Sequence, residues 1–334
     1  MKAIVQREFG APAELQLTDV PDPHAGAGEV RIRVESAGIH LLDTTVRRGA
    51  GSPNMRPELP VTPGREVAGI VDEVGDSVDA ALLGQLVVAD LAATGGGYAE
   101  LAVASAQTVH AIPEGVTADQ AVAMVGTGAT TMAILELAQP KSEDVVVVTA
   151  AAGGIGTLLV QMLRAVGATV VGVAGGPDKI SMVRELGSAA VDYHQPDWPQ
   201  TVREAVDKRP ITLVLDGVGG EIGRSALELL GVGGRLVMFG SASGELTPLS
   251  AADIYARGIT VSAAIGARTF APPLHPFQTR ALQAAATGQI TPIIGQRFAL
   301  SDAPAAHIAV ETRATIGKTV LRPDLATQSP RNPS

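Results

Sequence analysis

The sequence contains no cysteine, and this absence excludes disulfide bonds, a cysteine nucleophile and any zinc site built on thiolates. Aromatic residues are also scarce: they make up 3% of the 334 residues, against 46% for hydrophobic residues as a whole. The core must therefore be built from alanine, valine, leucine and isoleucine. The formal net charge is −9, and the sequence has no cluster of five or more basic residues. This balance argues against nucleic acid as a partner.

Long apolar runs are missing as well. No stretch reaches the ~18 consecutive apolar residues that a membrane-spanning helix needs. The beginning of the sequence, MKAIVQREFG, lacks the apolar region of a signal peptide. We therefore expect a soluble protein that acts in the cytoplasm and away from membranes. Its length is sufficient for two domains with a large core.

The most informative stretch is Asp144–Ala168, DVVVVTAAAGGIGTLLVQMLRAVGA. Its valine-rich beginning predicts a buried parallel strand, after which small residues lead into an apolar helix that ends near Gly167. A second strand is predicted at Ala168–Ala174. A turn of small residues between strand and helix presents backbone N–H groups and the positive end of the helix dipole to a pyrophosphate. The pattern predicts a dinucleotide site; an ordinary strand–turn–helix connection is the alternative.

The chain changes character along its length. Residues 1–122 contain many short strand patterns separated by glycine and proline turns, which are typical of a barrel-like or sandwich-like domain. Residues 123–265 alternate strands and helices and predict a doubly wound parallel sheet of about six strands. We expect residues 266–323 to return to the first domain and residues 324–334 to form a disordered tail. The predicted fold class is α/β, with a Rossmann sheet beside a β-rich domain.

The end of the second predicted strand bears on the choice of cofactor. A site for NAD usually carries Asp or Glu there to bind the ribose hydroxyls, whereas this strand ends in Ala174, Gly175 and Gly176. Without a carboxylate, a 2′-phosphate is not repelled, and Lys179 supplies a cation nearby. These features predict NADPH; a solvated helix residue is the alternative for Lys179.

Several motifs, taken in order, carry a resemblance to a known family. They are GIHLLDT (38–44) followed by Arg48–Gly49, PGREVAG (63–69), GATTMAIL (128–135), AAAGGIG (150–156), DGVGG (216–220), GGRLVMFG (233–240) and RATIGKTVL (313–321). With them the chain resembles the zinc-free medium-chain dehydrogenases/reductases over nearly its whole length, most closely the quinone oxidoreductase branch. The resemblance implies a GroES-like catalytic domain made of residues 1–122 and 266–323, a Rossmann domain and a cofactor in the cleft between them.

The resemblance also implies a homodimer formed by the cofactor domains, in which residues 259–265, ITVSAAI, would serve as an edge strand. Capping of this strand by a loop is the alternative. In the resembling branch a lysine matching Lys179, a tyrosine matching Tyr193 and a serine at the position of Gly175 contact the 2′-phosphate. The serine is replaced by glycine here, which removes one hydroxyl.

Further cofactor contacts follow from the same resemblance. Arg313 matches an arginine near the adenosine phosphate, with a surface salt bridge as the alternative. Thr130 matches a threonine near the nicotinamide amide, with a bond to its own helix backbone as the alternative. Phe239 follows a strand end, where ligands of such sheets bind, although it could be ordinary core. The complete predicted cofactor-binding set is Thr130, Ala151, Gly153, Gly154, Ile155, Gly156, Gly175, Lys179, Tyr193, Val218, Phe239, Gly240, Ser241 and Arg313.

Zinc is not expected. Zinc-containing members have Cys at the position of His40 and His at the position of Arg65, and they carry a lobe with four cysteines. Here the corresponding segment, Asp90–Glu100, is a short glycine-rich turn. His40 with Glu66 alone would give an incomplete site.

His40 and Asp43 are the candidate catalytic residues. The resembling branch usually has Asn at the position of His40, beside the nicotinamide. A histidine there can donate a hydrogen bond or a proton to a substrate carbonyl near neutral pH. Asp43 could orient it or simply cap the following helical turn, and a packed, structural His40 is the alternative. Glu66 is expected to organise the cleft by bonding backbone or an arginine rather than to act as a base.

These features together predict an NADPH-dependent reductase that transfers a hydride to a quinone or an α,β-unsaturated carbonyl without a metal. An enoyl or alkenal reductase of secondary metabolism is an alternative. A protein of the same fold that binds NADPH without turnover is a second one, because the active site of this branch has few obligatory side chains.

Overall fold

The computed structural model describes residues 1–50, 56–91, 95–264 and 274–324. The predicted tail, apart from Asp324, lies outside the described residues, as does Ile265, the last residue of the predicted edge strand. Contacts within the chain divide it into two units, Met1–Gly126 with Ile293–Ser334, and Thr127–Pro292.

The first unit is built on β-sheet. Seven strands form one sheet in the order β14-β15-β3-β4-β5-β7, with β6 paired to β3, and β1 and β2 form a separate hairpin. The strands are β1 (Lys2–Val5), β2 (Gln16–Asp19), β3 (Glu29–Ile39), β4 (Glu66–Val74), β5 (Leu86–Asp90), β6 (Leu101–Ser105), β7 (Val109–Ala111), β14 (Ile294–Ala299) and β15 (Lys318–Arg322). The helices are α1 (Leu41–Arg47), α2 (Ala118–Ala123) and α10 (Ala303–Glu311), with short 3₁₀ turns at Pro12–Glu14, Ala80–Leu82, Ala106–Thr108 and Leu300–Asp302.

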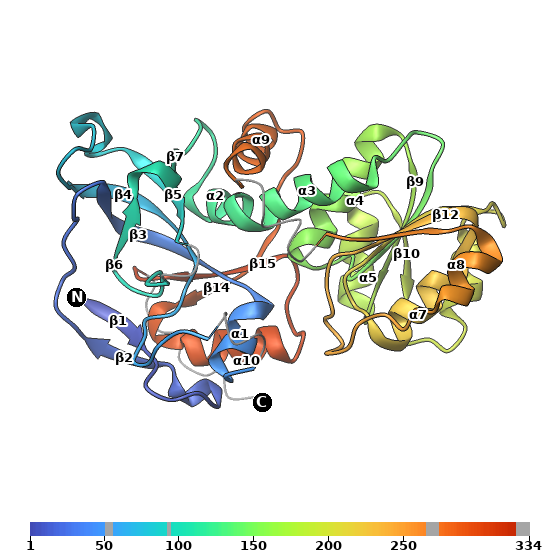
Figure 1. The fold of residues 1–334 in the computed structure, drawn as a ribbon, viewed down its shortest axis with the longest axis horizontal. Coiled ribbons are helices and arrows are strands. Elements are labelled where there is room, and N and C mark those ends of the chain that lie inside the picture. Colours follow the sequence, from blue (N-terminus) through green and yellow to red (C-terminus); the bar gives the residue numbers. More distant parts are fainter. Residues whose placement is uncertain (51–55, 92–94, 265–273, 325–334) are drawn as a thin grey trace. The chain divides into compact units, whose positions relative to one another are not determined.

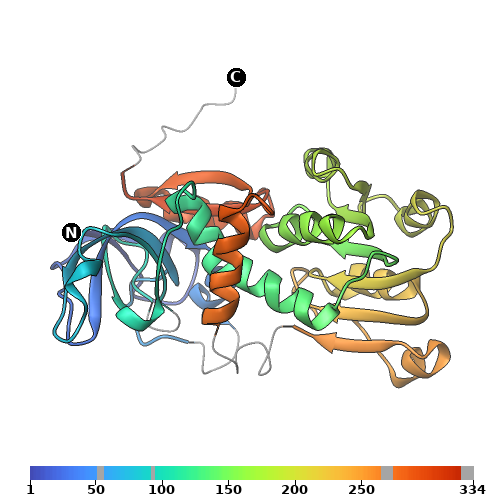
Figure 2. The ribbon, with the colours of Figure 1, turned by 90° about the horizontal axis from the view of Figure 1, so that it is seen from above.

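The C-terminal segment of the chain completes this sheet. β15 pairs antiparallel with β3, so that Val320 lies opposite Gly38. Figures 1 and 2 show the corresponding red strands beside the blue N-terminal ones. The alternation in EVRIRVESAGI predicts a half-buried strand, and Val30, Ile32 and Val34 are indeed buried. The prediction that the chain returns to its first domain is therefore supported by strand pairing.

The second unit is a doubly wound sheet, as predicted. Its six strands follow the order β10-β9-β8-β11-β12-β13, and every pair is parallel. The strands are β8 (Val145–Thr149), β9 (Thr169–Ala174), β10 (Ala189–Asp192), β11 (Ile211–Asp216), β12 (Leu230–Met238) and β13 (Thr260–Ala263). The helices are α3 (Ala129–Ala138), α4 (Gly154–Val166), α5 (Pro177–Glu185), α6 (Trp198–Ala205), α7 (Gly220–Leu229), α8 (Ala251–Arg257) and α9 (His275–Ala286).

The join between β8 and α4 shows why small residues are needed there. All five residues of β8 are buried. A Cβ atom on Gly156 would lie 2.2 Å from the backbone oxygen of Ala150, so only glycine lets the helix approach the strand this closely. Gly167 ends the helix in the left-handed conformation, with φ of 93°.

Both predicted domain boundaries differ from those in the structure. The first lies after Gly126 rather than after residue 122, and the chain returns to the first unit at Ile293 rather than at residue 266. The proline-rich segment after residue 266 resembles a linker, but the helix that follows it, α9, packs on α3 and contributes the ion pair Arg280–Glu136, with an N–O distance of 2.9 Å. Packing, not local composition, sets this boundary.

The helical stretch Ala118–Ala138 combines α2, a π-helical segment (Met124–Gly128) and α3. Thr117 and Gln120 form a capping box at its start, with the Thr117 N–H 3.0 Å from the Gln120 side-chain oxygen. By length and composition this stretch could cross a membrane. A single such helix is weak evidence for a membrane-spanning segment, because buried helices of globular cores have the same composition.

Candidate active site

The turn between β8 and α4 has the geometry of an anion site. The N–H of Gly153 donates to the oxygen of Ala150 at 2.9 Å, and the first bond into the helix runs from Thr157 N–H to Gly153. The amides of Gly154, Ile155 and Gly156 therefore precede the helix's own hydrogen bonds. A Cβ on Gly153 would meet one atom only, the Ala150 oxygen at 3.3 Å. This open backbone fits a pyrophosphate.

The end of β9 is the second predicted component of the nucleotide site. The strand ends at Ala174, and Gly176 follows with φ of 93° and no atom within 4 Å of its Cβ position. Tyr193 is held against this strand end, because its N–H donates to the Ala174 oxygen at 3.1 Å. Lys179 lies half-buried in the first turn of α5. No carboxylate side chain belongs to the end of β9 itself, as the sequence indicated.

A buried carboxylate organises the carboxyl ends of β8 and β11. Asp216 is fully buried, and its Oδ1 accepts hydrogen bonds from the Thr149 hydroxyl at 2.6 Å and from the Val218 N–H at 3.0 Å. Its Oδ2 accepts from the Thr247 hydroxyl at 2.5 Å. These bonds fix the DGVGG loop at the sheet edge where nucleotides bind. The DGVGG motif belongs to the family resemblance, but the sequence alone indicates no role for the Asp216 side chain.

The other predicted cofactor residues differ in how deeply they are buried. Phe239 is 4% exposed and packs on Gly217, whose Cβ position lies 2.5 Å from its ring, which agrees with the interpretation of Phe239 as core. Gly240 lies next to this packing, and Ser241 is exposed. Ala151 is buried below the glycine turn. In the second unit, Thr130 is half-buried at the start of α3, and in the first unit Arg313 is exposed with φ of 59°.

In the first unit, His40 joins two buried charges. Its Nε2 lies 2.6 Å from Oε1 of Glu66 and 2.9 Å from Nζ of Lys318, and Lys318 donates to Oε2 of Glu66 at 2.9 Å. The Glu66 and Lys318 side chains are 3% and 4% exposed, whereas His40 is 28% exposed. The imidazole of His40 is therefore the group of these three that contacts the buried charges and is also open to solvent.

Electrostatics keep Glu66 ionised. Burial raises the pKa of Glu66, but His40 and Lys318 outweigh this effect and bring the pKa down to about 2. An ionised carboxylate 2.6 Å from Nε2 favours a proton on that nitrogen. His40 would then meet a substrate through Nδ1. Glu66 is expected to bond backbone or an arginine, and the structure shows the side chains of a histidine and a lysine bonded to it.

Asp43 holds the backbone of His40. Its Oδ2 accepts the His40 N–H at 2.8 Å and the Tyr98 hydroxyl at 3.1 Å, and Arg65 lies 3.5 Å from Oδ1. The sequence left two roles open for Asp43, orienting His40 or capping the helical turn that follows, and these contacts match the cap of helix α1. Asp43 therefore positions His40 through the main chain.

Behind Asp43 lies a second buried histidine. Nε2 of His307 is 3.2 Å from the Tyr98 hydroxyl, and its Nδ1 is buried with no hydrogen-bond partner among the described residues. Because the Tyr98 hydroxyl donates to Asp43, His307 Nε2 acts as the donor to Tyr98. Protonating Nδ1 would bury an unpaired N–H. Burial accordingly lowers the pKa of His307 to about 4, with Asp43 opposing the shift.

Sequence analysis missed Lys318, Tyr98 and His307 as members of this site. Lys318 stood within a quoted family motif, RATIGKTVL, but a lysine in a strand carries no local sign of burial. Two glycines make room for the charges. A Cβ on Gly126 would collide with Oε1 of Glu66, and one on Gly38 would collide with Oε2.

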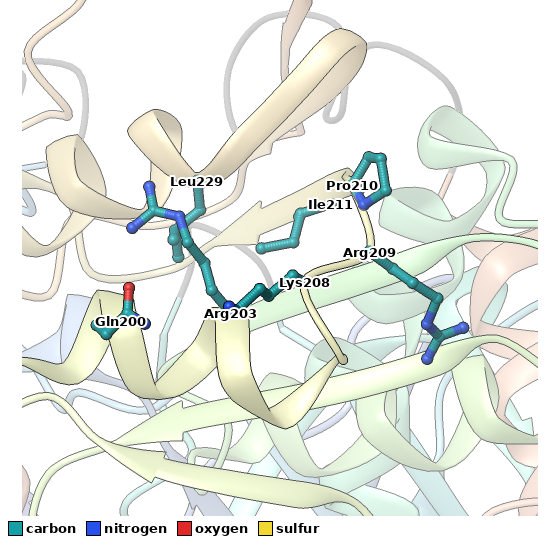
Figure 3. A pocket seen from close by; sticks show the side chains of 7 residues that line it. All are labelled: Gln200, Arg203, Lys208, Arg209, Pro210, Ile211 and Leu229. Carbon is teal, nitrogen blue, oxygen red and sulfur yellow. The ribbon is translucent and has the colours of Figure 1, made fainter.

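Two further observations concern metal ligands and a surface cavity. Within the described residues no group of three or more His, Cys, Asp or Glu side chains is placed to hold a metal ion. A surface cavity of about 240 Å³, lined by Arg203, Lys208, Ile211 and Leu229 among others, lies at the beginning of β11 (Figure 3). Nucleotides bind at the opposite, carboxyl ends of such strands, so this cavity is separate from the nucleotide turn.

A β-rich unit followed by a doubly wound sheet with a glycine turn defines the class of medium-chain dehydrogenases/reductases. Residues 26–114 match the model of the alcohol dehydrogenase GroES-like domain, and residues 154–286 match that of the zinc-binding dehydrogenases. The quinone oxidoreductase of Pseudomonas aeruginosa is 31% identical over 96% of this chain and 99% of its own length. That of the pig, Sus scrofa, is also 31% identical, over 96% of this chain and 97% of its own.

Two solved structures are similar to this chain over nearly its whole length. A mycobacterial protein in complex with NADPH is 32% identical, with a TM-score of 0.85 over 97% of this chain and all of that one. The Escherichia coli quinone oxidoreductase in complex with NADPH is 26% identical, with a TM-score of 0.87 over 97% of this chain and 100% of that one. The chain belongs to the quinone oxidoreductase family of medium-chain dehydrogenases/reductases, and the predicted family and fold class are confirmed. It is thus an oxidoreductase-type protein.

The buried state of His307 makes a testable prediction about stability. Because its pKa is lowered from 6.5 to about 4 in the folded protein, the unfolded chain binds more protons between these values. The contribution of neutral His307 is fully present above pH 6.5 and is lost as the pH falls toward 4. We expect His307→Gln to reduce the loss of unfolding free energy between pH 7 and pH 4.5 by about 2–3 kcal/mol, measured by urea denaturation. The wild type measured over the same pH range is the reference; the same fall in unfolding free energy in His307→Gln as in the wild type would contradict the prediction.

Proposed function

We propose that this protein is an NADPH-dependent reductase that transfers a hydride to a quinone or an α,β-unsaturated carbonyl without a metal. The observation that carries the proposal is the open glycine turn followed by β9, whose end bears no carboxylate side chain. Relatives of known structure that were solved with NADPH support it.

The cofactor would be held by backbone more than by side chains. The amides of Gly154, Ile155 and Gly156 face the pyrophosphate, and the dipole of the 13-residue helix α4 adds to their attraction. Lys179 and Tyr193 would contact the 2′-phosphate of the cofactor. When bound, NADPH supplies a hydride from C4 of its nicotinamide to an electrophilic carbon or oxygen of the substrate.

His40 would serve the substrate. As hydride arrives, negative charge develops on the carbonyl or quinone oxygen, and a positioned donor stabilises that charge. His40 meets this oxygen through Nδ1. Because Nε2 carries the proton that faces Glu66, Nδ1 donates only when the ring is an imidazolium, which then gives the Nδ1 proton to the reduced substrate. Glu66 holds the ring by its other nitrogen, with Oε1 2.6 Å from Nε2, and Lys318 in turn holds Glu66 by donating to Oε2.

We further propose that the protein forms a homodimer through β13. This strand ends the sheet order and pairs with β12 on one side. The segments before it expose large apolar side chains, with Tyr255 at 89% and Leu246 at 75% exposure. Pairing of two β13 strands would complete their edges and cover this surface. A cytoplasmic location belongs to the same proposal and agrees with the cysteine-free composition.

The main test is oxidation of NADPH, followed at its absorbance band, with a panel of quinones and enones. We expect turnover with NADPH and much weaker turnover with NADH. Activity on enones alone would indicate an enoyl or alkenal reductase. Binding of NADPH without any oxidation would identify a non-catalytic binding protein and overturn the proposal, while equal efficiency with NADH would overturn the cofactor preference.

The role of His40 is tested by His40→Ala. We expect kcat/KM to fall about 100-fold, as for removal of a general acid, while the Kd for NADPH changes little, because the residues proposed for the pyrophosphate and the 2′-phosphate belong to the second unit and His40 to the first. His24→Ala is the matched control, since it removes an exposed histidine of the same unit. An unchanged kcat/KM in His40→Ala would show that His40 is structural.

The dimer is tested by analytical ultracentrifugation. We expect twice the chain mass for the wild type and a shift toward monomer in the double variant Tyr255→Lys, Leu246→Lys, because charges at a buried apolar contact oppose association. Leu83→Lys, at a residue of the first unit that is 54% exposed, should leave the mass unchanged. A wild-type monomer would refute the proposal.

A further inference from the structure

The space beside Gly175 is occupied by its neighbours. A Cβ atom on Gly175 would lie 2.6 Å from Cε1 and 2.8 Å from Nε2 of His194, and 2.8 Å from Cε2 of Tyr193. No larger residue fits at position 175 without moving these rings. The side chains that fill the space beside Gly175 come from the loop that follows β10, and the polar ring atom among these contacts is Nε2 of His194.

His194 is held in a defined orientation. Its ring meets that of Tyr193 edge-to-face, with 5.0 Å between centroids and an angle of 89°. Oδ1 of Asp192 accepts the His194 N–H at 2.9 Å and lies 3.5 Å from its Nδ1. Because Nδ1 faces Asp192, Nε2 is the nitrogen presented at Gly175. The carboxylate of Asp192 is itself engaged in this turn.

We propose that His194 is a specificity-determining residue for NADPH, whose Nε2 donates a hydrogen bond to the 2′-phosphate of the adenosine ribose. The inference rests on the proposed function, because it assumes that the ribose lies at the end of β9. In sheets of this type the residue that reads the 2′ position follows the second strand of the βαβ unit, which is where Gly175 stands.

The chemistry of the imidazole suits this role. A phosphate dianion nearby favours the imidazolium form, in which both nitrogens donate. Such charge-assisted bonds are stronger than neutral ones. The His194 side chain is 65% exposed, so a ligand can reach it. A ribose without the phosphate offers no partner of that charge, and the residue therefore separates NADPH from NADH.

The test measures equilibrium binding of NADPH and of NADH by nicotinamide fluorescence. We expect His194→Ala to raise the Kd for NADPH about five- to tenfold and to leave the Kd for NADH unchanged. His194→Lys, which restores a cation, should recover most of the preference. His24→Ala is the matched control, because His24 is exposed and lies 3.3 Å from the carboxylate of Glu73 in the first unit.

The outcomes separate this inference from the function on which it rests. If the wild type binds both nucleotides equally, the NADPH preference itself is wrong. If the wild type prefers NADPH and His194→Ala keeps the full preference, then His194 only stabilises its turn and the inference is overturned. Equal weakening of both nucleotides would also overturn it.

Discussion

The carboxylate of Glu66 is the interaction on which the first unit's site depends. It is buried, ionised and held between Lys318 and His40. A buried charge without partners costs several kcal/mol, so both partners and the glycines that make room for the carboxylate must be present together. The three charged or polar side chains come from the start of β4, the start of β15 and the end of β3. Their meeting ties the C-terminal strand to the candidate catalytic histidine.

The site in the second unit depends on a different physical constraint. Its nucleotide turn needs an absence of side chains, so that backbone amides are open and the helix can approach the strand. Gly156 serves packing, since a Cβ would strike the Ala150 backbone, whereas Gly153 serves access, since its Cβ position is nearly open. Asp216 then fixes the neighbouring strand end through hydroxyl and backbone donors. The Asp216 carboxylate is thus hydrogen-bonded beneath the surface that a ligand would meet, which favours a preorganised strand end.

Much of this architecture follows from local patterns. Valine runs, the glycine turn and the alternation in β3 predicted strands and helices within a few residues of where they lie. The domain boundary near residue 266 was wrong because α9 is held by packing on α3, which has no signature in its own sequence. Asp43 could be read as an orienting or a capping residue, and only its contacts with the His40 backbone and Tyr98 distinguish the two.

The sequence by itself determined the α/β class, the nucleotide turn and the carboxylate-free end of β9, because periodicity, glycine spacing and missing side chains are local properties. Tertiary structure decided which side chains meet. Lys318 reaches His40 across 278 positions of sequence through the pairing of β15 with β3. His194 reaches Gly175 through the pairing of β10 with β9. Strand pairing brings distant residues together, and no pattern within either segment reveals the partner.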